Sequence, residues 1–191
     1  MPDTVLSNGS DFQSAMARER DTSRPVVLIG FQQMENLGLG YLTSTLRAFG
    51  YEVLVFDFEQ DAKEILKVVR ARDPFLIGLS LIFQLYVPQF RSLVGYLRDN
   101  GVDCHFTIGG HFPSLSYDQT LDLVPGLDTV VRFEGELTLL ELADCLSIGE
   151  HSRELQPRGI VAKGTADSDD PNQGRSISSF KKCVEHEMHG S

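Results

Sequence analysis

PVVLIGFQQMENLGLGYLTSTLRAFGYEVLVFD, residues 25–57, is the stretch that decides the fold of this chain. It opens with an apolar run, and a second apolar run extends from Val53 to Phe58. Between them Leu39, Leu42 and Leu46 recur at helical spacing, and Gly50 offers the left-handed backbone that ends a helix. The stretch therefore predicts a strand, a helix and a strand. Since neither strand alternates with polar residues, we expect a parallel sheet covered on both faces.

The same alternation continues along the chain. Further apolar strands are expected at residues 75–81, 103–108 and 127–132, and helices at 59–72, around 90–97, from Pro113 to about residue 125, and from Glu134 to about residue 146. Arg158 to Ala162 could add a short edge strand. The prediction is an α/β fold with a doubly wound, five-stranded parallel sheet, in which ligands bind beyond the carboxyl ends of the strands.

The pattern divides the chain into three parts. Residues 1–24 are polar and charged and are interpreted as a leader, and residues 25–162 form the α/β domain. Residues 163–191 are expected to be a flexible tail, because 163–179 is rich in Asp, Ser, Gly and Asn. Near the end, Cys183, His186 and His189 could ligate a metal, but a short frayed helix is the preferred interpretation.

Composition narrows the possible partners. The chain has 191 residues, 41% of them hydrophobic, and a formal net charge of -10, which gives no basic surface for nucleic acid or an anionic membrane. No stretch approaches the roughly 18 apolar residues of a membrane-spanning helix, so a cytoplasmic protein is expected. GxSxG, HExxH and P-loop motifs are absent from the sequence.

Small residues mark the expected ligand edge of the sheet. Gly38 and Gly40 lie in the first turns of a helix, where each costs about 1 kcal/mol against Ala. Close approach of a planar ligand or of a neighbouring strand could compensate for this cost. Ser80, Gly109 and Gly110 follow the third and fourth strands, where small side chains admit a ligand, although tight turns would also explain them.

Polar residues at the same edge are the candidate functional groups. Gln32, Gln33 and Met34 occupy the first loop, as ligand contacts or as a solvated loop. His111 could hydrogen-bond a ligand, transfer a proton or be an ordinary surface histidine. Glu134 precedes Gly135 at a helix start, where a carboxylate suits the helix dipole. The catalytic candidates are His111, Glu134 and Gln33, and no metal-ligating residue is assigned.

Four stretches together match a known pattern: LGLGYLTSTLRAFGYEVLVFD at 37–57, DPFLIGLSL at 73–81, FTIGGHFPSLSYDQTL at 106–121 and VVRFEGELTLLELA at 130–143. Over roughly residues 25–147 the chain resembles the cobalamin-binding domain of cobalamin-dependent radical SAM enzymes. The resemblance implies a flavodoxin-like, Rossmann-like fold with strand order 2-1-3-4-5 and cobalamin as the cofactor. The positions expected to bind it are Gln32, Gln33, Met34, Gly38, Ser80, Gly109, Gly110, His111, Glu134 and Gly135.

Two departures from the wider pattern are informative. Many cobalamin domains carry DxHxxG after the first strand, whose His binds cobalt, but here the loop reads GFQQMENLG at 30–38. Bound cobalamin is therefore expected to be base-off, with no axial His from the first loop. The CxxxCxxC motif of radical SAM enzymes is also missing, since Cys104, Cys145 and Cys183 are scattered. The sequence alone is thus not expected to generate a radical.

These points support a primary hypothesis and two alternatives. The primary hypothesis is a stand-alone cobalamin-binding module that presents the corrinoid to a partner catalytic protein in methyl or radical transfer. That partner would dock over the carboxyl edge, where Phe83 and Phe112 lie beside the first loop. The first alternative is a small-molecule enzyme that reuses the fold without cobalamin and acts through rim His, Glu and Gln residues. The second is a ligand sensor.

Overall fold

The computed structural model describes residues 20–32, 36–148 and 159–162. Its centre is a six-stranded sheet of order β2-β1-β3-β4-β5-β6. The strands are β1 (Val26–Gly30), β2 (Val53–Asp57), β3 (Leu76–Ser80), β4 (His105–Gly109), β5 (Thr129–Val131) and β6 (Ile160–Ala162). The first five are parallel in the predicted order, and β6 pairs antiparallel with β5. The flavodoxin-like α/β prediction is confirmed, with an antiparallel edge strand added.

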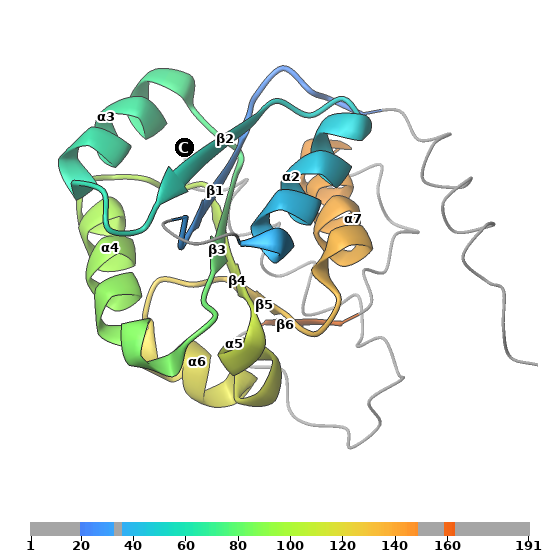
Figure 1. Cartoon of the computed structure of the whole chain (residues 1–191). Helices are drawn as coiled ribbons and strands as arrows, with labels where there is room; N and C mark the ends of the chain where they lie inside the picture. The colour runs from blue at the N-terminus through green and yellow to red at the C-terminus, as the bar shows by residue number, and fades with distance from the viewer. Residues whose placement is uncertain (1–19, 33–35, 149–158, 163–191) are drawn as a thin grey trace, which may run out of the picture.

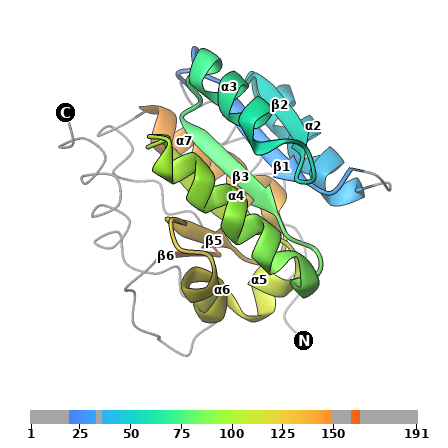
Figure 2. The ribbon, with the colours of Figure 1, turned by 90° about the vertical axis from the view of Figure 1, so that its left-hand side faces the viewer.

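Helices cover both faces of the sheet (Figure 1). The helices are α2 (Leu37–Ala48), α3 (Ala62–Arg72), α4 (Val87–Asp99), α5 (His111–Leu115), α6 (Tyr117–Leu123) and α7 (Gly135–Ile148), and a short 3-10 turn, η1 (Gln84–Tyr86), precedes α4. On one side α2 and α7 lie next to each other, while α3 and α4 lie on the other, with α4 crossing the front of the sheet in Figure 2. This arrangement leaves the carboxyl ends of β1 and β3–β5 at one shared edge.

The apolar strands form two cores because alternate side chains point to opposite faces of the sheet. Val27 and Ile77 belong to the core under α3 and α4, whereas Leu28 and Leu76 belong to the core under α2 and α7. All five residues of β1 are buried, as the uninterrupted apolar run predicts.

One predicted helix is two helices. The segment expected to be continuous from Pro113 to about residue 125 is divided into α5 and α6 at Ser116. Ser116 leaves helical geometry with φ −135° and ψ 48°, and its carbonyl then accepts the Thr120 amide that opens the second helix. Pro113 lies in the first turn of α5, as expected from its fixed φ. The break places α5 directly against the end of β4.

The described end of the N-terminal segment is attached to the domain. Arg20 makes two hydrogen bonds to the buried Asp144 of α7, at 2.7 and 3.0 Å, and its guanidinium lies 5.0 Å from the centre of the Phe49 ring. Tyr51 also donates to Asp144 at 2.9 Å, and burial raises the pKa of this phenol, so it stays protonated. The expected tail at 163–191 lies outside the described residues.

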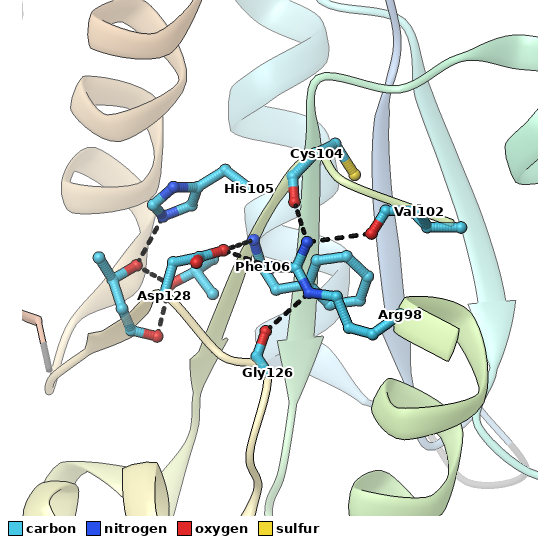
Figure 3. Close-up of polar contacts among 9 residues, drawn as sticks. Arg98, Val102, Cys104, His105, Phe106, Gly126 and Asp128 are labelled. Carbon is cyan, nitrogen blue, oxygen red and sulfur yellow. Dashed lines mark hydrogen bonds and ion pairs between the residues drawn. The ribbon is translucent and has the colours of Figure 1, made fainter. Parts of the chain in front are cut away.

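A second polar network closes the amino ends of β4 and β5, remote from the carboxyl edge (Figure 3). Arg98 pairs with Asp128 at 2.7 Å and donates to the carbonyls of Val102, Cys104 and Gly126. The same Asp128 oxygen accepts the Phe106 amide at 2.7 Å. Since these groups satisfy one another, we interpret this network as structural. Among the described residues, no helix is long and apolar enough to cross a membrane.

Candidate functional site

A pocket of about 520 Å³ opens at the carboxyl edge of the sheet, on the face covered by α2 and α7. Its volume lies within the range of small-molecule and cofactor sites. The pocket runs from the rim down to mid-strand positions, where Leu28, Gly78 and Thr107 form its floor. Leu39 and Leu42 of α2 and Leu139 of α7 form apolar walls.

Two glycines line this pocket without a side chain. A Cβ on Gly78 would lie 2.8 Å from Leu28 Cδ2, and a Cβ on Gly109 would lie 3.2 Å from the Val131 carbonyl oxygen. The space beside each glycine is therefore occupied by Leu28 or by Val131, and a larger residue at either position would force these neighbours to move.

Gly110 has a different role from Gly109. Its φ of +117° and ψ of −171° lie in a region that only glycine adopts readily. A Cβ there would also overlap the backbone of Leu81, which follows β3. Gly110 is therefore required for the turn between β4 and α5.

The pocket mouth is held by a short loop after β5. Phe133 adopts a positive φ of 61°, and its amide donates to Ser114 Oγ at 2.8 Å. Ser114 Oγ in turn donates to the Gly110 carbonyl at 2.7 Å. Arg132 lies over the rings of Tyr117 and Phe133, at 4.5 and 4.8 Å from their centres. These contacts fix an exposed aromatic ring at the edge of the pocket.

A chain of hydrogen bonds connects the pocket floor to a buried histidine. Thr107 Oγ1 accepts from Thr129 Oγ1 at 2.9 Å, and Thr129 Oγ1 lies 2.9 Å from His105 Nε2. His105 is 1% exposed. Burial lowers the pKa of its imidazole from 6.5 to about 4, so the ring is neutral at physiological pH.

Most of the predicted site residues meet at this pocket. It is lined by Gly38, Ser80, Gly109, Gly110, His111, Glu134 and Gly135. Gln32 is exposed and does not line the pocket, and its backbone N–H donates to Asp57 Oδ2 at 2.9 Å. Gln33 and Met34 lie outside the described residues. Of the catalytic candidates, His111 and Glu134 therefore share the pocket rim.

The two helix glycines differ in position. Gly38 lines the pocket and a Cβ there would make only an ordinary contact, 3.6 Å from Asn36 Oδ1. A Cβ on Gly40 would meet nothing within 4 Å. A neighbouring strand therefore explains neither glycine. The helix that carries both glycines is capped by Asn36, whose side-chain oxygen accepts a hydrogen bond from the Leu39 backbone amide at 3.0 Å.

Sequence reasoning missed several pocket residues. The missed residues are Leu28, Leu39, Leu42, Gly78, Leu79, Thr107, Ser114, Leu115, Val131, Phe133, Glu136 and Leu139. Gly78 carried a usable signal, since a glycine inside an apolar strand often marks close approach of another group. Thr107 is a polar residue in an apolar strand and could also have been noticed. Phe133 had no such signal, because its exposure depends on the turn after β5.

Exposed apolar side chains follow several strands at the carboxyl edge, and Leu115 and Phe133 among them line the pocket. Each of the following is more than half exposed and follows the carboxyl end of a parallel strand: Leu37, Phe83, Leu85, Leu115 and Phe133. We call these five residues the apolar rim. Phe112 is not part of it, because it is partly buried and packs against the core under α3 and α4. No group of three or more metal-ligating side chains occurs within the described part of the chain.

Comparison with known proteins identifies similar sequences. A family model described as the B12 binding domain matches residues 24–143. An uncharacterised methyltransferase from Pyrococcus horikoshii is 30% identical over 128 residues, which is 65% of this chain and 26% of that protein. The chain thus spans about a quarter of that relative's length.

Solved structures share the fold. A cobalamin-binding protein from Desulfitobacterium hafniense superimposes with a TM-score of 0.53 and 21% identity, covering 63% of this chain and 57% of the other. A methanol:cobalamin methyltransferase complex from Methanosarcina barkeri gives a TM-score of 0.52 and 21% identity, covering 69% of this chain and 49% of the other. At these identities the likeness concerns the fold.

Proposed function

Because the chain belongs to the B12 binding domain family, we propose that it binds cobalamin at the carboxyl edge of its sheet and presents it to a catalytic protein for methyl transfer. The observation that carries this proposal is the pocket of about 520 Å³, which lies at that edge and has Gly78, Ser80 and Gly109 among its lining residues. The corrin ring would lie over the rim, and the nucleotide tail would enter the pocket.

The residues present fit such a tail. An aromatic base needs a flat, mainly apolar slot, which Leu39, Leu42 and Leu139 supply from the two covering helices. Gly78 and Gly109 line the pocket and place no side chain in it. Ser80 offers a hydroxyl at the rim for the polar part of the tail.

We further propose the base-off state without a histidine on cobalt. The first loop contains no histidine, and the pocket is deep enough to hold the tail away from the corrin. His111 is the one histidine that lines the pocket within the described chain, so it is the residue to test if a nitrogen ligand is found.

Bound cobalamin would supply a cobalt centre that can accept and donate a methyl group. This chain would contribute binding and presentation. The apolar rim supports a partner, since several exposed apolar side chains at one edge of a sheet are typical of surfaces that another protein covers. The M. barkeri structure is of a cobalamin methyltransferase complex. The relative from P. horikoshii is called a methyltransferase. These two names favour methyl transfer over the alternative small-molecule chemistry at His111 and Glu134.

Spectroscopy tests the proposal. The purified chain is titrated with hydroxocobalamin and followed by the corrin absorbance, and the reduced Co(II) form is examined by electron paramagnetic resonance. We expect saturable binding and a Co(II) signal without nitrogen superhyperfine splitting. Failure to bind would refute the cofactor proposal, whereas binding with nitrogen splitting would refute only the absence of a nitrogen ligand on cobalt. The splitting should then be sought in His111→Ala, which would remove it if His111 is the ligand.

A further inference from the structure

We propose that Thr107 recognises the nucleotide base of the corrinoid by donating a hydrogen bond to a ring nitrogen at the pocket floor, with Thr129 and His105 as positioning residues. This inference rests on the proposed function and adds which corrinoids the pocket prefers. The hydrogen bond from Thr107 would favour corrinoids whose lower base carries a nitrogen acceptor over those with a phenolic base.

Thr107 is the residue through which the buried chain reaches the pocket. It lines the floor, whereas neither Thr129 nor His105 lines the pocket. Thr107 is 2% exposed, so it lies deep below the rim. The neighbouring floor positions, Leu28 and Gly78, carry no side-chain hydrogen-bonding group.

The hydrogen-bond chain leaves the hydroxyl proton of Thr107 available to a ligand. Thr129 donates to Thr107 Oγ1 at 2.9 Å, and Thr107 donates to the Thr129 carbonyl at 3.3 Å. The second distance is long for a hydroxyl donor, whose usual range ends near 3.0 Å. Rotation of the Thr107 hydroxyl toward a ligand would therefore give up only the long bond to the Thr129 carbonyl. The shorter bond that Thr107 Oγ1 accepts from Thr129 would remain.

The tautomer of His105 sets the direction of this chain of hydrogen bonds. With its pKa lowered to about 4 by burial, its imidazole is neutral and one ring nitrogen carries a proton. If Nε2 carries it, His105 donates to Thr129 Oγ1, which leaves the Thr129 proton for Thr107. His105 and Thr129 then donate in sequence to Thr107, the residue that lines the pocket floor, and consecutive hydrogen bonds of this kind strengthen one another.

The ligand would supply the matching acceptor. A benzimidazole or purine base that does not coordinate cobalt has an unpaired ring nitrogen, which is costly to bury without a donor. A phenolic base has no such nitrogen. The apolar walls formed by Leu39, Leu42 and Leu139 bind either ring, so the donor at the floor distinguishes the two classes.

The test compares three corrinoids by equilibrium dialysis: cobalamin, a cresolyl cobamide with a phenolic base, and cobinamide, which has no nucleotide tail. Cobalamin has to release its base from cobalt before it binds base-off, whereas the cresolyl base does not coordinate cobalt, so the readout is the ratio of the two affinities in each variant relative to the wild type. Thr107→Val should weaken cobalamin binding about tenfold, as expected for the loss of one well-placed hydrogen bond, while changing the affinity for the cresolyl cobamide little. Thr107→Ser should keep the wild-type ratio.

Thr43→Val is the matched control, because Thr43 is also buried on this face but bonds the Leu39 carbonyl at 2.7 Å and does not line the pocket. Thr43→Val should keep the wild-type ratio of the two affinities. The same ratio in Thr107→Val as in the wild type, whether both affinities stay or both fall equally, would overturn the inference and leave the proposed function standing. Absence of binding by all three corrinoids would refute the proposed function as well.

Discussion

Gly110 lies so close to the backbone of Leu81 that a Cβ on residue 110 would be 2.8 Å from the Leu81 carbonyl carbon. The contact joins the loop after β4 to the segment after β3, and it therefore sets the shape of the pocket rim. A hydrogen bond also holds Leu81 in place, because its backbone amide donates to the Gly109 carbonyl at 2.8 Å.

Gly110→Ala should destabilise the fold strongly. The substitution combines a backbone conformation that costs about 1–3 kcal/mol for a non-glycine residue with overlap that costs about as much again. Gly101→Ala is the control, since Gly101 also has positive φ, +78°, but has nothing within 4 Å of its Cβ position. Urea denaturation should show the larger loss for Gly110→Ala. Equal losses would mean that the contact with Leu81 contributes nothing.

The buried pair of Arg20 and Asp144 should be sensitive to loss of one partner. The two side chains are 8% and 0% exposed. Arg20→Leu leaves a buried carboxylate without its cation and should lower the free energy of unfolding by about 3 kcal/mol. The comparison is Arg72→Leu, which removes an exposed pair with Glu52 and should cost less than about 1 kcal/mol. Thermal unfolding of both variants measures the difference. Similar, small losses would show that residue 20 is not anchored as described.

His105 should make stability depend on pH. Its folded pKa of about 4 lies below its ordinary value of 6.5, so the unfolded chain binds more protons between these values. The stability that depends on neutral His105 is complete above pH 6.5. It falls as the pH decreases toward 4, by on the order of 3 kcal/mol at most.

The control for this effect is His105→Gln, which keeps an amide nitrogen near the Nε2 position but does not titrate. Urea denaturation of both proteins from pH 4 to 7 isolates the histidine, because the carboxylates titrate in both. The difference in free energy of unfolding should change across this range. A difference that stays constant with pH would contradict the assignment of a neutral buried ring.

Much of the fold could be predicted because the determining signals are local. The uninterrupted apolar run of β1 and the helical spacing of Leu39, Leu42 and Leu46 identify the element types directly. Ser116 shows the limit of this reasoning, since nothing in its neighbourhood distinguishes a break between α5 and α6 from a continuous helix. Strand β6 could only be proposed, because three residues acquire strand structure from pairing with β5.

The candidate site was predicted less completely than the fold. Ser80 and Gly109 were identifiable because they follow strands, and parallel topology brings strand ends together. Thr107 and Leu139 line the pocket from within elements, so their roles depend on depth and on the packing of α7 against α2. Sequence patterns do not encode the space left between two packed helices. Glycine has several uses, which is why the sequence left both pocket lining and a tight turn open for Gly110.

The most direct test of the central claim, that cobalamin occupies this pocket, is equilibrium dialysis of hydroxocobalamin against the wild type, Gly38→Leu and Gly40→Leu. Both substitutions replace a helix glycine and should raise helix propensity alike, but only residue 38 lines the pocket. We predict that Gly40→Leu binds like the wild type and that Gly38→Leu binds at least tenfold more weakly, with both folded by circular dichroism. Equal affinity of the three proteins, or no binding by the wild type, would contradict the account.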